Sequence, residues 1–415
     1  MVNQLKKSLK LTLITFLISV FLLCAANFGL SIYKGVSAIN EASSDLNQFL
    51  AFEQAVIDLN KNNTPLEVKI EDGISQENQN VSDTEIEQEE NFSKFELKRL
   101  IVTGDLKNNY GALNVYSYND IHILAYSTEK ETKLAYEELI KDSSLGVVID
   151  QYHQTEGYAD EAYDYTTGYQ NWGAEAIDIG GYRKFLSDNS VTKEVVVVVI
   201  DTGLNTSHEM FTNRLLKENG KVKGYSYFNS PYQYSYSNLA FDIDDTKKYS
   251  FEDDNGHGTH VAGIICDLTP SNVKILPIKI GNPENENKSS DSIMLSAYLR
   301  VLNIYSEKYN VVCTNLSYSG AGKDSESSRD TFNEQCYNPL LELNILPITA
   351  AGNESAENNI EGLNAVVVSA LKKQNGLYTF DNSYSNYGKI VDISAPGTNI
   401  SSAGIALSDK ADASY

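Results

Sequence analysis

The sequence predicts an α/β fold built on a doubly wound parallel sheet, preceded by a small α+β module. Residues 195–200 read VVVVVI, and an unbroken β-branched run is typical of a strand buried on both faces. Beyond residue 171, such runs alternate with helical patterns. Alternating strands and helices imply right-handed crossovers and a parallel sheet. In such a sheet ligands bind at the carboxyl ends of the strands, so the chemistry is expected there.

The remaining elements of this large region follow in order. A helix is expected from near Thr259. Strands are expected at 273–280 (VKILPIKI), 311–317 (VVCTNLS), 345–352 (ILPITAAG) and 365–371 (AVVVSAL), with a helix at 292–305 (SIMLSAYLRVLNIY). The helix has apolar positions at helical spacing, and the strands are short apolar runs.

A smaller module is predicted at residues 95–152. It has strand-like runs at 95–104, 121–127 and 145–151, and an amphipathic helix at 129–142 with Leu134, Leu139 and Ile140 as its apolar positions. About sixty residues that mix short strands and a helix indicate a small α+β domain, which we interpret as ferredoxin-like. The Tyr- and acid-rich stretch at 153–170 shows no periodicity, so we expect an exposed joint there.

The N-terminal 38 residues resemble an export signal. Lys6, Lys7 and Lys10 precede an uncharged run at 11–33, and Val36, Ser37 and Ala38 offer small residues for cleavage. An uncleaved anchor through 11–33 is the main alternative, since the run is long enough to cross a bilayer; a buried core helix is another. With a signal or an anchor, the protein would be extracellular, secreted or tethered to the outer face of the membrane.

Residues 39–94 are interpreted as an acidic low-complexity linker. Residues 71–90 contain eight acidic side chains and no basic one, a pattern typical of a solvated connector.

Composition excludes several classes. The 415 residues carry a formal charge of −23, which argues against nucleic acid as a partner because phosphates attract Lys and Arg. The hydrophobic share of 41% excludes a wholly disordered chain. Cys266, Cys313 and Cys336 lack CxxC spacing, and we expect free, buried thiols.

Asp201 directly follows the valine run, in IDTG. A carboxylate at the end of a buried strand is held rigidly, which suits a group that orients a base. A turn aspartate is the simpler alternative. An aspartic protease needs two such carboxylates, and the chain has no second DTG or DSG.

The strongest motif is DNGHGTHVAG at 254–263. Glycines flank His257, which leaves its imidazole room at a helix start, and Asp201 could fix one ring nitrogen while the other accepts a proton. Two alternatives remain open: His257 and His260 as metal ligands, although no HExxH frame is present, or two purely structural histidines.

Two further segments leave strand ends. In AAGNE at 350–354, the Asn353 amide could stabilise an oxyanion, although AGN alone is commonplace in turns. In NLSYSG at 315–320, the backbone could pair with an extended peptide, or simply end a strand.

Taken together, these motifs resemble the subtilase family of serine endopeptidases, over residues 170–415. The matching stretches are VVVIDTGLNTSHEMF, DDNGHGTHVAGII, NLSYSG, ITAAGNE and ISAPGTNI. Their order, Asp before His, is the one known for subtilisin.

The resemblance implies roles for individual residues. Asp201 would orient the imidazole, His257 would be the general base, and Asn353 would donate to the oxyanion. The substrate, a protein or peptide, would lie between Ser317, Tyr318 and Ser319 on one side and Ala350, Ala351 and Gly352 on the other. The module at 95–152 resembles the family's propeptide, an intramolecular inhibitor. No cofactor is implied, although calcium is common in relatives; Asp242, Asp244 and Asp245, or Glu252 and Asp253, are conceivable ligands, and a solvated acidic loop is the simpler interpretation.

One departure concerns the nucleophile. Ala395, Pro396 and Gly397 match the family, but no GTS motif occurs in the 415 residues. We expect that motif beyond Tyr415, in a catalytic domain (171–415) that is incomplete at its C-terminus, and we expect the 415-residue chain to be inactive. Without the continuation, the small-residue face of the helix at 259–268 should lack a packing partner. The alternatives are a non-catalytic, peptide-binding remnant of the family and, more distantly, a metal-dependent hydrolase.

Overall fold

The computed structural model describes residues 44–61, 97–154, 161–162, 172–228, 241–242, 250–405 and 413–414. The chain divides into two compact units, Met1–Gln54 and Ala55–Tyr415. Within the described ranges, no helix has the length and apolar character needed to cross a bilayer. The expected leader at 1–38 and most of the expected joint at 153–170 lie outside those ranges.

Residues 44–61 form a helix, so the expected linker at 39–94 is wrong over this stretch. Phe49, Phe52, Val56 and Ile57 are buried, and their spacing of three to four residues gives the helix one apolar face. The linker was expected because residues 71–90 are acidic, but this composition does not extend to residues 44–61, where apolar residues recur at helical spacing.

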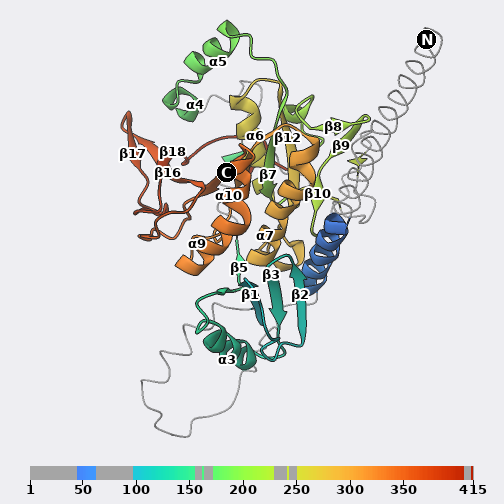
Figure 1. Ribbon diagram of the computed structural model, residues 1–415. Coiled ribbons are helices and arrows are strands. Elements are labelled where there is room, and N and C mark those ends of the chain that lie inside the picture. The colour runs from blue at the N-terminus through green and yellow to red at the C-terminus, as the bar shows by residue number, and fades with distance from the viewer. Residues whose placement is uncertain are drawn as a thin grey trace, which may run out of the picture. The chain divides into compact units, whose positions relative to one another are not determined.

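The predicted α/β sheet is confirmed in the second unit (Figure 1). Its strands run in the order β10-β12-β7-β14-β15-β16-β17, and β18 also pairs with β16. Their bounds are Tyr225–Ser226 (β10), Val273–Lys279 (β12), Val195–Asp201 (β7), Val311–Leu316 (β14), Leu346–Ala350 (β15), Val366–Gln374 (β16), Leu377–Phe380 (β17) and Ile393–Pro396 (β18). Every pairing is parallel except that of β17 with β16. The carboxyl ends of β7, β14 and β15 therefore meet at one edge.

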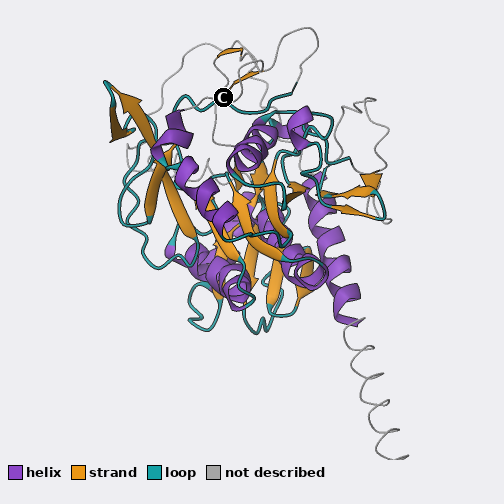
Figure 2. Cartoon of the chain, turned by 90° about the horizontal axis from the view of Figure 1, so that it is seen from above, coloured by secondary structure: helices purple, strands orange, loops and turns teal. Residues whose placement is uncertain are grey.

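Helices lie on both faces of this sheet (Figure 2). The helices of this region are α4 (Trp172–Ala176), α5 (Ile179–Asp188), α6 (His257–Leu268), α7 (Asp291–Arg300), α8 (Ser306–Lys308), α9 (Glu326–Phe332) and α10 (Asn338–Glu342). Single helical turns are η2 (Glu209–Phe211) and η3 (Pro283–Asn285), and π-helical turns are η4 (Val301–Tyr305) and η5 (Asn333–Tyr337). Short strands are β5 (Tyr152–His153), β6 (Glu161–Ala162), β8 (Lys217–Glu218), β9 (Lys221–Lys223), β11 (Phe241–Asp242), β13 (Ser289–Ser290) and β19 (Ala413–Ser414).

The core around β7 includes α6. Val197 and Val199 pack in one cluster with Ala262 and Cys266. Cys266 and Cys336 are buried and Cys313 is partly buried, all of them free thiols.

The small-residue face of α6 does have a packing partner, contrary to expectation. Ala403 belongs to the same core cluster as Ala262, and Ser402 Oγ donates to the His260 carbonyl at 2.7 Å. A Cβ on Gly263 would collide with Ser402 and Ala403, so the absence of a side chain allows this close approach.

The small module forms a separate four-stranded sheet, with the order β2-β3-β1-β4. Its elements are β1 (Arg99–Thr103), β2 (Asn114–Tyr118), β3 (Ile121–Ala125), α3 (Glu129–Leu139) and β4 (Gly146–Ile149). This is a ferredoxin-like strand order with one helix of the two; residues 104–113, between β1 and β2, form loops and turns. The sequence analysis missed β2.

The apolar face of α3 differs from the expected one. Thr132, Ala135 and Leu139 are buried, whereas Leu134 is 57% and Ile140 51% exposed. A capping box of Thr128 and Glu131 fixes the helix start, and Ala135 and Leu139 pack in one cluster with residues of the sheet.

The module packs against α7 and α9. Asp150 accepts hydrogen bonds from the Ser292 backbone at 3.1 Å and from its hydroxyl at 2.7 Å, at the start of α7. Arg99 forms a buried ion pair with Asp150 at 3.0 Å, and Ser327 of α9 donates to the Val147 carbonyl. The contact is therefore polar, buried and directional.

Candidate active site

Asp201 and His257 meet at the carboxyl end of β7. The His257 Nδ1 lies 2.7 Å from Asp201 Oδ1, and both side chains are buried. Asp201 Oδ1 also accepts from the Thr202 backbone N–H at 2.7 Å. A carboxylate on Nδ1 fixes the tautomer that leaves Nε2 as the proton acceptor, which is the arrangement a general base needs.

Asp253 holds the start of α6 against the end of β7. Its carboxylate accepts from the Thr202 hydroxyl, the Gly256 N–H and the Thr259 N–H, each at 2.9 Å. The Gly258 N–H in turn donates to the Thr202 hydroxyl. The His257 N–H donates to the Asn255 side chain. His257 therefore lies at a helix N-terminus whose backbone donors are shared among Asp253, Thr202 and Asn255.

A buried lysine keeps this acid ionised. Burial raises the pKa of Asp253, but Lys279 and the backbone donors outweigh it and lower the pKa. Lys279 forms an ion pair with Asp254 at 2.9 Å and also donates to the Thr202 carbonyl. Neither Asp253 nor Lys279 was predicted to support the site. Two signals were present in the sequence: Lys279 is a charged residue at the end of the apolar run of β12, and Asp253 begins the DDNGHG motif.

His260 faces away from this pair. Its Nε2 lies 2.9 Å from the Ile400 carbonyl, and burial lowers its pKa to about 4. A neutral imidazole that donates to a carbonyl has a structural role. Among the described side chains, neither His260 nor His257 belongs to a group with metal-ligand spacing.

The segment 317–319 follows β14, and one of its side chains is turned inward. The Ser319 N–H donates to the Gln154 carbonyl at 3.4 Å, so its backbone pairs with an extended chain. Ser317 is partly buried and accepts from Asn315. Tyr318 is fully buried and its hydroxyl donates to the Asn287 carbonyl, so its side chain does not line a substrate site as expected.

The segment 350–353 follows β15, two strands away from β7 in the sheet. Asn386 holds it by donating to the Ala351 carbonyl at 3.1 Å and accepting from the Glu354 N–H at 3.0 Å. Gly352 accepts from the Asn386 N–H. Asn353 is partly exposed, which suits a donor to a bound group.

A buried lysine that the sequence analysis missed joins the two segments. Lys323 Nζ donates to the Tyr318 carbonyl and the Ala350 carbonyl, both at 2.7 Å, and to the Thr349 hydroxyl at 2.9 Å. It therefore fixes the spacing between the two expected walls of the peptide site.

The acidic residues considered for calcium are not a solvated loop where they are described. Glu252 and Asp253 are buried; Glu252 accepts from the Thr206 N–H and hydroxyl. Burial raises the pKa of Glu252 to about 7. The side chain of Asp242, and Asp244 and Asp245, lie outside the described part.

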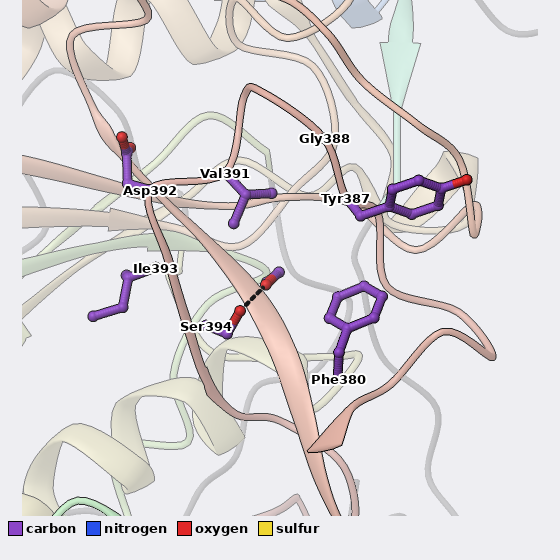
Figure 3. Close-up of a pocket in the computed structure, with 8 residues that line it drawn as sticks. Phe380, Tyr387, Gly388, Val391, Asp392, Ile393 and Ser394 are labelled. Carbon is purple, nitrogen blue, oxygen red and sulfur yellow. Dashed lines mark hydrogen bonds between the residues drawn. The ribbon is translucent and has the colours of Figure 1, made fainter. Parts of the chain in front are cut away.

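A hollow lies elsewhere, beside β16 and β18 (Figure 3). It is lined by Phe380, Tyr387, Val391, Asp392 and Ile393, among others, and is crossed by a hydrogen bond of 2.6 Å between Ser369 and Ser394. None of the expected site residues lines it. The Asp201–His257 pair lies instead at the carboxyl end of β7.

The comparisons with known proteins agree with this geometry. The model of the subtilase family, peptidase S8, matches residues 192–415. Alkaline protease 1 of Aspergillus flavus is 28% identical over 57% of this chain and 52% of its own length. Cerevisin of Saccharomyces cerevisiae is 27% identical over 57% of this chain and 33% of its own.

The chain thus spans about half the length of the curated relatives it matches, or less. Among solved structures, a cold adapted subtilisin-like serine proteinase is 23% identical, with a TM-score of 0.35, over 51% of this chain and 66% of its own. Since the family model covers more than half of the residues, the chain belongs to the subtilase family of serine peptidases.

Proposed function

We propose that this chain is the precursor of a secreted serine endopeptidase. The observation that carries the proposal is the buried Asp201–His257 pair at 2.7 Å. A serine Oγ would attack the peptide carbonyl carbon while His257 Nε2 takes the serine proton. The same nitrogen would return that proton to the leaving amine, and a water would then hydrolyse the acyl-enzyme in the same way.

The other site residues take supporting roles in this proposal. Asp201 would stabilise the imidazolium that forms during each step. Asn353 would donate its amide N–H to the oxyanion of the tetrahedral intermediate. Ser317 and Ser319, with Ala350, Ala351 and Gly352 across from them, would hold the substrate backbone.

The module at 95–152 would act as an inhibitory propeptide. Its last strand continues into Tyr152–His153, which pairs with Ser289–Ser290, and Gln154 contacts Ser319. The tail thus occupies the segment at which a peptide substrate is expected. A leader at 1–38 would place the protein outside the cytoplasm, either released or tethered through 11–33.

The experiment is covalent labelling with a fluorophosphonate, which reacts with activated serines. Because no GTS motif occurs in the 415 residues, we expect this chain to stay unlabelled. A version extended by a GTS-bearing subtilase segment should label, and it should lose labelling in its His257→Ala variant. Labelling of the 415-residue chain, or none in the extended one, would contradict the proposal; the latter outcome would favour a non-catalytic peptide-binding member.

Maturation offers a second test. Cleavage of the extended precursor should fall within residues 153–170, as N-terminal sequencing of the secreted protein would show. A mature N-terminus before Phe95 would exclude the propeptide role. The separated module, added back, should inhibit the mature enzyme.

A further inference from the structure

The tail of the small module presents one side chain to the large domain. Tyr152 and His153 pair antiparallel with Ser289 and Ser290. The Gln154 carbonyl accepts from the Ser319 N–H on the other side. His153 is thereby held between two backbone segments, as one residue of a bound extended peptide would be.

The His153 ring enters an acidic pocket. Its Nε2 lies 3.1 Å from Asp291 Oδ2 and 3.9 Å from Asp324 Oδ2. The ring also covers Gly320, where a Cβ would lie 2.5 Å from three ring atoms, and Gly320 itself has a positive φ of 76°. The absence of a side chain there leaves room for a flat or narrow group.

Asp291 is fully buried at the start of α7. Its Oδ1 accepts from the Ala321 N–H at 3.3 Å, while Oδ2 is directed at His153 and has no hydrogen bond of good geometry. A buried carboxylate with no counter-charge is strongly destabilising, so this position calls for a cation. The Asp324 side chain is 36% exposed, whereas His153 beside it is buried.

We propose that Asp291 and Asp324 form a subsite of the peptide cleft that selects a cationic side chain, and that His153 fills it in the precursor. The proposal rests on the peptide-binding function proposed above and names its substrate class: peptides with His, Lys or Arg at the position that His153 occupies.

The electrostatics agree with the geometry. Burial lowers the pKa of His153, but Asp291 and Asp324 outweigh burial and raise the pKa to about 9, against an opposing effect of Lys323. Burial raises the pKa of Asp324, His153 and Lys323 oppose this shift, and the charges of Asp291 and Glu354 add to it. His153 is thus held as an imidazolium at neutral pH. The pKa of His153 in the folded state lies above the unfolded value of 6.5. The stabilisation of the folded chain by the His153 imidazolium is therefore complete below pH 6.5 and is lost as the pH rises through about 9.

The first test measures how firmly the 415-residue chain holds its own tail. Hydrogen exchange of the peptide that contains residues 150–154 should be about 10- to 100-fold faster in His153→Gln at pH 7, since each pKa unit of coupling is tenfold. His153→Lys should remain near the wild-type rate. The matched control is His122→Gln, because His122 contacts Ser117 and the Gly104 carbonyl in the same module; its tail should exchange at the wild-type rate. A tail equally protected in His153→Gln would overturn the proposal.

The second test measures selectivity with a free ligand. Labelled peptides that copy residues 146–156, with His153→Arg or His153→Gln, are titrated into the full-length His153→Gln chain. We expect the Arg peptide to bind at least tenfold more tightly, and Asp291→Asn to remove the difference.

The outcomes separate two failures. Equal binding of the two peptides overturns the cationic subsite and leaves the peptide-binding function intact. Binding of neither peptide counts against the proposed function itself and the subsite with it. Tail protection that EDTA abolishes and zinc restores would overturn the proposal in favour of a metal bound by His153, Asp291 and Asp324, whose ligand atoms lie within 4.8 Å of one another.

Discussion

His257 and His153 are both buried imidazoles in contact with a buried carboxylate, but the two contacts differ in the ring nitrogen involved and in the elements they join. Among the described residues, His257 meets the Asp201 carboxylate through Nδ1 at 2.7 Å. His153 meets two, Asp291 and Asp324, through Nε2 at 3.1 and 3.9 Å. The first pair joins a strand end to the next helix of one sheet domain, whereas the second joins the small module to that domain.

The difference shows that residue types alone do not set a histidine's role. A carboxylate on Nδ1 orients the ring and fixes its tautomer, which suits the general-base role proposed for His257. Two carboxylates around Nε2 favour the charged ring, which suits a contact that holds and not one that exchanges protons. Under the proposed cleavage of the joint, a site inside one domain would persist, whereas a contact between module and domain would be open to release.

The largest expected effect separates these two roles directly. In a chain extended by a GTS-bearing segment, His257→Ala should lower kcat by about 10⁶-fold, the loss seen when a triad base is removed. Secretion and folding of the precursor should be unaffected. The measurement is hydrolysis of a peptide substrate by the matured enzyme. Should His260→Ala abolish turnover in a folded protein while His257→Ala does not, the assignment of the base is wrong.

The next effect tests the other side of the cleft. Asn353→Ala in the extended chain should lower kcat by about 10²–10³-fold with little change in KM, because an oxyanion donor acts chiefly in the transition state. Steady-state kinetics on the same peptide provides both constants. A loss in KM alone would make Asn353 a substrate-binding residue.

A third prediction concerns His260, which lies on α6 with His257, and its effect on the pH dependence of stability. His260 has a pKa of about 4 in the folded state, below its ordinary 6.5. The unfolded chain therefore binds an extra proton between these values, and stability falls as the pH drops from 6.5 to 4, by about 3 kcal/mol at most. Urea unfolding at several pH values should show a shallower acid loss in His260→Gln. Identical slopes in both proteins would contradict this.

The smallest effect concerns Glu252, beside the Asp253 network. Its pKa is raised by burial from 4.5 to about 7, so the folded state holds a proton that the unfolded state releases. Stability is therefore lost as the pH rises from 4.5 through 7, by about 1–3 kcal/mol. The Glu252→Gln variant should not show this loss of stability, so its stability relative to the wild type should increase between pH 5 and pH 8. Thermal melts of both proteins at pH 5 and pH 8 measure this change. A difference in Tm between variant and wild type that is the same at both pH values would show that Glu252 stays ionised.

The sequence by itself determined the parts that depend on local pattern. The VVVVVI run predicted β7, because a strand buried on both faces needs continuous apolar residues. The DNGHGTHVAG motif predicted a helix from near Thr259, two residues after the observed start of α6 at His257. It also made His257 the candidate base, since its glycines and histidine are adjacent in the chain. The strand ends that carry Asp201, Ser317 and Ala350 followed from the rule that parallel strands share one functional edge.

Tertiary structure decided which side chains meet. Nothing local shows that Tyr318 turns inward to the Asn287 carbonyl or that Lys323 ties together two strand ends. The same holds for His153 and Asp291, which are distant in sequence yet 3.1 Å apart. The periodicity of a sequence shows only which face of a single element is buried. Contacts such as that of His153 with Asp291 depend on how two elements pack against each other. Only this packing removes the two charged groups from water and brings them together.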